Sequence, residues 1–341
     1  MKYITQICKS MHKGGGAELY FRNISAQPIF QNDIKFRQSI ILNKDNFDAD
    51  FANTFAHPVR TGNLHDVEEA INNGDIILFW GDLKLNNSKL KKPQVCVIWS
   101  CTEDALIIEN NKSYITHAIA TSKKTASITC YNIDHIISFS GLDYNNLNTN
   151  ISRYDLRKKL NILEDDFVLG MIARIGETKR QRWLLDAVNK IKNKKIKAIF
   201  VGDGDKRKYL EQLRVPNCLF VGHKNDVGNW YQILDAFCIL SRNEGAPATL
   251  FESFYMKIPV IHTDVGMTQE LCNCTNSFLV KSKDELPDVI NHVYKLNKNA
   301  KDMFTDNAYE LYEKHGKIEF AATQWYNFFK NIKTVNCRSL L

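Results

Sequence analysis

The sequence has no apolar run that approaches the roughly 20 residues needed to cross a bilayer as a helix. Its first eight residues also lack the apolar stretch and small-residue cleavage site of a secretory signal. We therefore expect a cytoplasmic protein. The nine cysteines are odd in number and scattered, which argues against a disulfide framework. Cys272 and Cys274 form a pair with no second pair at zinc spacing.

Three common catalytic motifs are absent. The chain has no Gly-x-Ser-x-Gly nucleophile turn, no His-Glu-x-x-His zinc motif and no Walker phosphate loop. Hydrolase, metalloprotease and P-loop nucleotidase functions therefore lack their chemistry, and we expect neither a metal nor another resident cofactor. No arginine-rich stripe with interleaved aromatic residues indicates nucleic acid binding.

The net charge of +7 lies in the second part of the chain, because acidic and basic residues balance over residues 1–150. A solvated lysine-rich surface, an anionic ligand or a peripheral contact with an anionic membrane would each explain the excess. The length of 341 residues is large for one hydrophobic core, so two domains are expected.

Between residues 167 and 264, short apolar runs bounded by Gly or Asp alternate with amphipathic stretches. The expected strands are 167–173, 197–202, 218–222, 236–241 and 259–264, and the expected helices are 181–191, 206–214, 227–234 and 247–257. This alternation is typical of an α/β fold with a parallel, doubly wound sheet.

The first half follows a similar but weaker pattern. Strands are expected at 3–8, 34–42, 75–80, 95–99, 114–120 and 135–139, with a helix at 17–25. Residues 141–150 hold four asparagines and fit a linker. The aromatic-rich helix 318–332 needs a face to pack on, either across both domains or within the second. We expect domains at 1–145 and 146–317, with 318–341 packing back toward the first.

Two carboxylates eight positions apart, Glu244 and Glu252, flank an expected junction between a loop and a helix. Pro247 suits the first helical position, which leaves three amides free to bind an anion, those of Ala248, Thr249 and Leu250. A phosphate in the middle with hydroxyl groups on either side suits this layout. The segment therefore indicates a nucleotide-linked sugar as ligand.

Further candidates follow other strands at their carboxyl ends, where doubly wound sheets bind ligands. Arg174 and Lys179 follow the strand 167–173 and supply a planar fork and a point charge for phosphate oxygens. Gly202 and Gly222 end the next two strands and permit turns close to a ligand, although turn chemistry alone would also explain them.

The first half offers a glycine turn after its first strand. Gly15 and Gly16 would let the backbone approach an anion at the start of the following helix. The side chains best placed to meet an acceptor on this side are His12, Glu18 and His57.

With these residues the chain resembles the retaining glycosyltransferases of family 4, which have the GT-B fold. The resemblance is strongest over residues 165–282. It rests on Gly170-Met-Ile-Ala-Arg174 with Lys179, Val201-Gly-Asp-Gly204, Phe220-Val-Gly222, Ser241-Arg-Asn-Glu-Gly245, the Glu244/Glu252 pair and Pro259-Val-Ile. The turn from Gly14 to Glu18 looks like the glycine loop of the family.

The resemblance implies two Rossmann-like domains that face each other across a cleft, with a nucleotide-sugar donor held mainly by the second. Arg174 and Lys179 would hold the pyrophosphate, Glu244 the hydroxyls of the transferred sugar and Glu252 the ribose. The amides of residues 248–250 would meet the phosphate or the sugar, and Gly15 and Gly16 would approach from the first domain. Transfer would retain the anomeric configuration by attack on the same face, without a protein nucleophile or a metal.

The sequence departs from the family where a histidine often lies near the sugar, because residues 97–104 contain none. Ser100, Glu103 and Asp104 are the substitutes we consider. The family implies a UDP- or GDP-sugar donor, a glycan or lipid-linked acceptor and a role in bacterial surface polysaccharide synthesis. Two alternatives stay open, a nucleotide-sugar epimerase of the same fold and a catalytically silent binding subunit.

Overall fold

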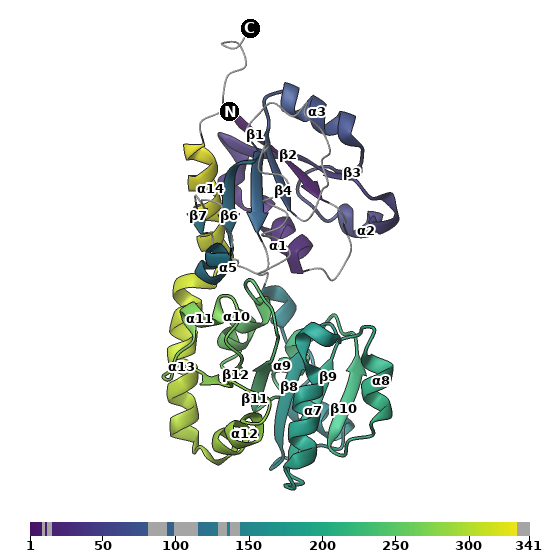
Figure 1. Cartoon of the computed structure of the whole chain (residues 1–341), viewed down its shortest axis with the longest axis vertical. Helices are drawn as coiled ribbons and strands as arrows, with labels where there is room; N and C mark the ends of the chain where they lie inside the picture. The colour runs from purple at the N-terminus through teal and green to yellow at the C-terminus, as the bar shows by residue number, and fades with distance from the viewer. Residues whose placement is uncertain are drawn as a thin grey trace. The chain divides into compact units, whose positions relative to one another are not determined.

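The computed structural model describes residues 1–8, 11, 16–80, 94–98, 115–128, 135–136 and 144–332. The chain divides into two compact units, each with one parallel sheet flanked by helices (Figure 1). Unit 1 comprises Met1–Leu142 and His315–Leu341, and unit 2 comprises Asp143–Lys314. The C-terminal segment therefore belongs to the same unit as the N-terminus.

The sheet of unit 1 has the order β3-β2-β1-β4-β5-β6-β7. Its strands are β1 (Lys2–Cys8), β2 (Ile34–Ile41), β3 (Val59–Thr61), β4 (Ile76–Trp80), β5 (Gln94–Ile98), β6 (Ile115–Ala120) and β7 (His135–Ile136). The helices around it are α1 (Gly16–Ser25), α2 (Ala49–Ala52), α3 (Leu64–Asn72) and α5 (Lys123–Ile128). A capping box at Asn63 and Asp66 fixes the start of α3, because each side chain accepts from the backbone of the other.

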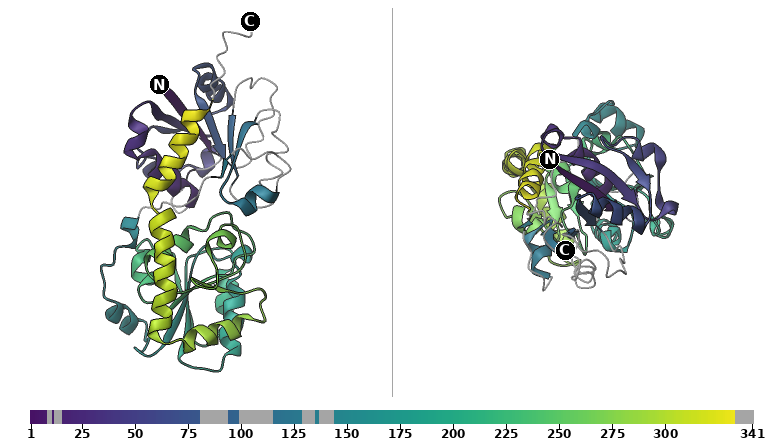
Figure 2. Two further views of the ribbon diagram at one scale, coloured as in Figure 1. Left: turned by 90° about the vertical axis from the view of Figure 1, so that its left-hand side faces the viewer. Right: turned by 90° about the horizontal axis from the view of Figure 1, so that it is seen from above.

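The last helix, α14 (Ile318–Asn331), packs on α1 and β2 of unit 1 (Figure 2). Trp325 is fully buried there and donates from its indole N–H to the Tyr20 hydroxyl at 2.7 Å. Lys2 supports the end of the helix, because its Nζ donates to the carbonyls of Phe329, Lys330 and Ile332. A cation at a helix C-terminus satisfies unpaired carbonyls and favours the helix dipole.

The sheet of unit 2 has the order β10-β9-β8-β11-β12-β13. Strands β9 and β10 lie on one side of β8, and β11 to β13 lie on the other side, so the order of the strands reverses between β8 and β11. Its strands are β8 (Phe167–Ile172), β9 (Ile196–Val201), β10 (Cys218–Gly222), β11 (Ala236–Ile239), β12 (Val260–His262) and β13 (Phe278–Leu279). The helices are α6 (Arg153–Lys159), α7 (Gln181–Lys190), α8 (Arg207–Gln212), α9 (Val227–Tyr231), α10 (Ala248–Tyr255), α11 (Thr268–Leu271), α12 (Leu286–Lys295) and α13 (Lys298–His315).

Two hydrophobic clusters cover the two faces of this sheet. Side chains of α7 and α12, such as Leu184 and Ile290, form one cluster, and side chains of α9 and α10, such as Tyr231 and Phe254, form the other. All six residues of β8 are buried, as expected for a central parallel strand. The carboxyl ends of β8 and β11 therefore lie side by side at the edge where a ligand binds in such sheets.

The predicted α/β architecture is confirmed, and the strands and helices predicted between residues 167 and 264 are all present with small shifts at their ends. One local prediction is wrong, because Pro247 is the N-cap of α10 and not its first helical residue. No pattern in the sequence led to a prediction of β3, β13, α2, α3, α5, α6, α11, α12 or α13. In the part of the chain that the structure describes, no helix has both the length and the apolarity of a membrane span.

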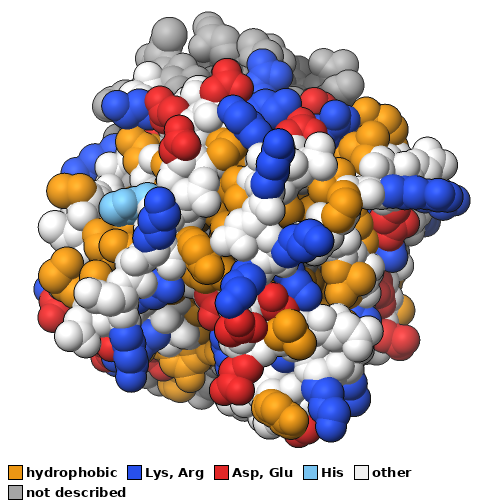
Figure 3. Space-filling view, turned by 90° about the horizontal axis from the view of Figure 1, so that it is seen from below, with side chains coloured by type: hydrophobic (Ala, Val, Ile, Leu, Met, Phe, Trp, Pro, Cys, Tyr) orange, Lys and Arg blue, Asp and Glu red, His pale blue; other side chains and the backbone are white. Residues whose placement is uncertain are grey.

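The surface in Figure 3 shows how the basic residues are distributed on one face of the molecule. Lys and Arg side chains lie among Asp, Glu and apolar ones there instead of forming one continuous patch. This distribution fits the interpretation of the +7 charge as a mainly solvated surface on that face.

Candidate functional site

The central feature of the candidate site is an ion pair between Lys179 and Glu244 at the carboxyl edge of the unit 2 sheet. Lys179 ends η4 (Glu177–Lys179) after β8, and Glu244 lies in the loop after β11. Ser241 donates to the same carboxylate oxygen, Glu244 Oε1, at 2.6 Å. The amide of Arg242 donates to the carbonyl of Thr178 at 2.7 Å and ties the two loops together.

The pair joins two of the residues that the sequence analysis proposed, although they lie 65 positions apart. Both side chains are mostly buried, with 28% of Lys179 and 14% of Glu244 exposed. A partly desolvated ion pair with an added hydroxyl donor holds the carboxylate in one orientation. Glu244 is then a fixed acceptor for hydroxyl hydrogen bonds.

The N-terminus of α10 follows Glu244 by four residues. The amide of Leu250 donates to the carbonyl of Pro247 at 3.0 Å, so it is already used. The amides of Ala248 and Thr249 have no acceptor among the described residues. Two of the three amides that were predicted to bind an anion are therefore free to do so. Free N–H groups at a helix N-terminus attract an anion.

Glu252 lies one turn into α10 and is half-buried. Its Oε2 accepts a hydrogen bond of 2.6 Å from the hydroxyl of Tyr231, which ends α9. Burial raises the pKa of the Glu252 carboxyl, and the hydrogen bond from Tyr231 opposes that rise. Burial and the neighbouring carboxylate together raise the pKa of Tyr231 well above its ordinary range, so it remains a donor at neutral pH.

Arg174 differs from the buried pair because 79% of its side chain is exposed. Its nearest acidic partner is Asp205 at 3.8 Å, which is a weak contact at this exposure. The backbone beneath it is fixed, since Gln181 donates to the carbonyl of Arg174 at 2.9 Å and accepts from the amide of Gly176 at 3.3 Å. The guanidinium is therefore free to reach an incoming anion from a rigid loop.

The glycines at the strand ends allow neighbouring loops to approach closely. A Cβ on Gly202, which has a φ of +139°, would lie 2.0 Å from the carbonyl oxygen of Ala173. A Cβ on Gly266 would lie 2.1 Å from the carbonyl oxygen of Gly245. Gly222 has a φ of +76° and accepts from the amide of Gly202 at 2.8 Å. Backbone packing thus explains Gly202 without a ligand.

The candidates of unit 1 have a different outcome. His57 is buried, with its ring stacked on Phe36 and its Nε2 2.8 Å from the hydroxyl of Ser39. Glu18 is buried in α1. These positions give no support to the acceptor-side roles predicted for His57 and Glu18. Gly16 is the first residue of α1. His12, Gly15, Ser100, Glu103 and Asp104 lie outside the described residues.

Sequence reasoning missed three residues that support the site. Ser241 belongs to the motif Ser241-Arg-Asn-Glu-Gly245, and its position two residues after β11 was the available signal. Gln181 opens α7, where a side-chain amide can reach back to the loop. Tyr231 gave no signal, because its contact with Glu252 depends on how α9 and α10 pack.

Comparison with known proteins finds a family match over part of the chain. Residues 152–311 match the family described as Glycosyl transferases group 1. The Escherichia coli O-antigen biosynthesis glycosyltransferase WclY is 25% identical over 244 residues, which cover 70% of this chain and 64% of that protein. The Salmonella typhi Vi polysaccharide biosynthesis protein VipC/TviE is 34% identical over 112 residues, 31% of this chain and 19% of that protein. The chain thus spans less than two thirds of the length of these relatives.

Solved structures share the whole fold. Anabaena Alr3699/HepE in complex with UDP has a TM-score of 0.78 at 19% identity, covering 97% of this chain and 100% of that one. WaaG, a glycosyltransferase involved in lipopolysaccharide biosynthesis, has a TM-score of 0.72 at 13% identity and covers 96% and 100%. With its two Rossmann-like units, the chain has the GT-B fold and carries a glycosyl transferases group 1 domain over residues 152–311.

Proposed function

We propose that the chain is a retaining glycosyltransferase that moves a sugar from a UDP- or GDP-sugar to a glycan or lipid-linked glycan of a bacterial surface polysaccharide. The observation that carries this proposal is the ion pair between Lys179 and Glu244. Glu244 lies four residues before the free amides at the start of α10. It combines a phosphate-binding end with a fixed hydroxyl acceptor. The curated relatives act in O-antigen and other polysaccharide synthesis, which supports the acceptor class.

The donor residues divide according to their chemistry. Arg174 and Lys179 neutralise the pyrophosphate, and the amides of Ala248 and Thr249 contribute hydrogen bonds to it or to the sugar. Glu244 accepts from the hydroxyls of the transferred sugar, and Glu252 accepts from the ribose. Each carboxylate is oriented by a hydroxyl donor, Ser241 for Glu244 and Tyr231 for Glu252.

The reaction proposed for this site needs no protein nucleophile. The acceptor oxygen forms a bond to the anomeric carbon on the face that the leaving phosphate occupies, while the bond from that carbon to the phosphate oxygen breaks. The leaving phosphate takes the proton of the acceptor hydroxyl, so the configuration is retained. Arg174 and Lys179 stabilise the negative charge that grows on the departing nucleotide, and we propose that they replace a metal ion in this role.

The test is turnover with a panel of UDP- and GDP-sugars and of glycan and lipid-linked acceptors, followed by release of UDP or GDP. Release that depends on the acceptor and persists in a chelator supports the proposal, and the anomeric configuration of the product tests retention. Conversion of a UDP-sugar to its epimer without an acceptor would instead identify an epimerase. No nucleotide binding by calorimetry would identify a silent binding subunit.

A peripheral contact with the membrane is a separate part of this proposal. The net charge of +7 would favour an anionic surface, where a lipid-linked acceptor would also be found. Sedimentation with vesicles of anionic and of neutral lipid tests it, and equal binding to both would contradict an electrostatic contact.

A further inference from the structure

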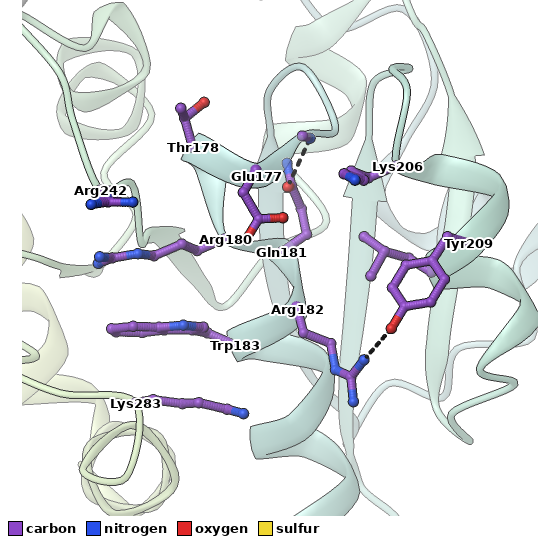
Figure 4. Close-up of a pocket in the computed structure, with 12 residues that line it drawn as sticks. Glu177, Thr178, Arg180, Gln181, Arg182, Trp183, Lys206, Tyr209, Arg242 and Lys283 are labelled. Carbon is purple, nitrogen blue, oxygen red and sulfur yellow. Dashed lines mark hydrogen bonds between the residues drawn. The ribbon is translucent and has the colours of Figure 1, made fainter.

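Unit 2 contains a cavity of about 460 Å³ beneath the loop that follows β8 (Figure 4). Its walls come from η4, the start of α7, α8 and the loops after β11 and β13. The four side chains of the proposed donor site, Arg174, Lys179, Glu244 and Glu252, do not line it. The cavity is therefore a separate space close to the proposed donor residues.

The lining carries more positive than negative charge. Arg182 and Lys283 both pair with Asp186 at 2.7 Å, so one carboxylate serves two cations. The other cations of the lining, Arg180, Arg242 and Lys206, have no acidic partner among the described residues. Glu177 contributes the one carboxylate among the lining residues. Among the described residues, the lining thus keeps an excess of positive charge.

Arg180 occupies an unfavourable backbone and electrostatic position. It has a φ of +55° between η4 and α7, where a non-glycine residue costs about 1–2 kcal/mol. Its guanidinium lies 4.3 Å from the ring centroid of Trp183, so the stacking orders it. Burial lowers the pKa of Arg180, and the like charge of nearby Arg242 lowers it further. Strain and repulsion that meet at one residue are typical of a functional site.

Hydrogen bonds tie the backbone of Arg242 and the side chain of Arg182 to their surroundings. The amide of Arg242 donates to the carbonyl of Thr178, which fixes the loop that carries it beside η4. Arg182 donates to the hydroxyl of Tyr209 at 3.0 Å across the cavity. In Figure 4 the side chains of Arg242, Arg180, Trp183 and Lys283 lie one above another along one wall. Arg182, Lys206 and Arg242 are exposed, so an incoming anion can reach the cationic groups of the lining.

We propose that this cavity binds a doubly charged phosphoryl or pyrophosphoryl group, as a second anion site beside the donor site. Two guanidinium forks match phosphate oxygens, and a ligand with two negative charges would offset the excess positive charge without overcompensating it. The volume falls in the range of small-molecule sites and exceeds the need of one phosphate, so the group would carry a further substituent.

An occupant of this cavity would communicate with the proposed donor site through the backbone. Arg180 follows Lys179 directly, and Arg242 precedes Glu244 by two residues in the same loop. Neutralising the two arginines would therefore affect the ion pair that orients Glu244. The phosphoryl group has two chemical sources, a free phosphate compound or a lipid-linked diphosphate of an acceptor.

Calorimetric titration of the whole chain of 341 residues with inorganic pyrophosphate, with and without saturating UDP, tests the proposal. We expect pyrophosphate to bind when UDP is present, because UDP occupies the other site. Arg242→Gln should weaken this binding about 10- to 100-fold, the effect of losing a charged hydrogen bond. Arg180→Gly should weaken it similarly without lowering the melting temperature, since glycine suits the positive φ.

Lys208→Gln is the matched control, because it removes one positive charge from α8 outside the lining. It should leave the affinity for pyrophosphate within about 2-fold of the wild type. This change is smaller than a tenfold change in affinity, which corresponds to about 1.4 kcal/mol. A parallel titration with farnesyl diphosphate distinguishes the two sources of the phosphoryl group. Tighter binding than that of inorganic pyrophosphate supports a lipid-linked diphosphate, and weaker binding supports a free phosphate compound.

The proposal is overturned if wild-type protein binds no pyrophosphate, or if Arg242→Gln and Arg180→Gly bind it as the wild type does. A loss in Lys208→Gln equal to that in Arg242→Gln would also overturn it, because it would show general charge attraction. If UDP does not bind, the proposal of a nucleotide-sugar donor fails. The titration without UDP, with the same variants, then still tests whether the cavity binds pyrophosphate.

Discussion

At the scale of single residues, Glu244 is the group whose surroundings are most specialised. It pairs with Lys179 and accepts from Ser241 on the same oxygen. We expect Glu244→Ala to lower turnover about 10²- to 10³-fold, and Arg174→Ala to do the same through the pyrophosphate. Initial rates of nucleotide release measure both effects. Unchanged turnover in either variant would remove that residue from the site.

The matched controls for these variants are Glu164→Ala and Lys190→Ala. Both residues lie in unit 2 and take no part in the interactions of the donor residues. Turnover in the controls should match the wild type, so that a loss in the site variants reflects the donor contacts.

Tyr231→Phe tests the proposed role of Glu252. The change deletes the hydroxyl that donates to Glu252 and leaves a half-buried carboxylate with less support. The pKa of Glu252 should rise further, and unfolding free energy should fall by about 1–3 kcal/mol. We expect nucleotide affinity to weaken and to become more sensitive to low pH.

Tyr294→Phe is the control for this change, because Tyr294 contacts Phe167 through its ring. Urea unfolding and calorimetry with UDP measure the two effects. Equal nucleotide affinity in Tyr231→Phe and wild-type protein would argue against a ribose contact by Glu252.

At the scale of elements, the carboxyl edge of the unit 2 sheet depends on close approach of backbones. Gly202→Ala would place a Cβ 2.0 Å from the carbonyl oxygen of Ala173, and backbone cannot give way as a side chain does. We expect a loss of about 3 kcal/mol or more in unfolding free energy. Gly222→Ala should cost only about 1–2 kcal/mol, since its Cβ would meet the movable end of Arg207. Urea unfolding compares the two, and equal losses would contradict this account.

Also at this scale, the crossover order β8-β11 decides which loops meet. The periodicity of the sequence predicted these strands, and their loops, from local residues alone. It did not predict α12, α13 or β13. The apolar residues of α13 follow no regular spacing and β13 has only two residues, whereas α12 is amphipathic and its spacing was an available signal. The predicted start of α10 at Pro247 was one residue early because the N-cap retains extended backbone there.

At the scale of the whole molecule, both units bury a histidine that must stay neutral. Burial lowers the pKa of His57 to about 4, and it also lowers the pKa of His262 in unit 2. An unfolded chain binds the proton near pH 6.5, so acid favours unfolding between about pH 6.5 and 4. The stability that neutral His57 contributes is present above pH 6.5 and is lost as pH falls through this window.

The expected loss from His57 is about 2–4 kcal/mol between pH 7.5 and 4. His57→Gln removes the titration and preserves a partner for Ser39, so its unfolding free energy should fall less over the same range. Urea unfolding at a series of pH values measures the difference. Parallel pH profiles for the variant and the wild type would show that folding does not lower the pKa of His57.

The sequence by itself determined the alternation of strands and helices, the carboxyl-edge positions of Arg174 and Lys179, and the spacing of Glu244 and Glu252. These features depend on residues near one another in the chain, where apolar period and turn chemistry act directly. Tertiary structure alone decided that Lys179 meets Glu244, that His57 is buried and that Arg180 and Arg242 share one cavity. The reason is physical, since strand order and helix packing bring these side chains together from distant loops, and no local pattern specifies that order.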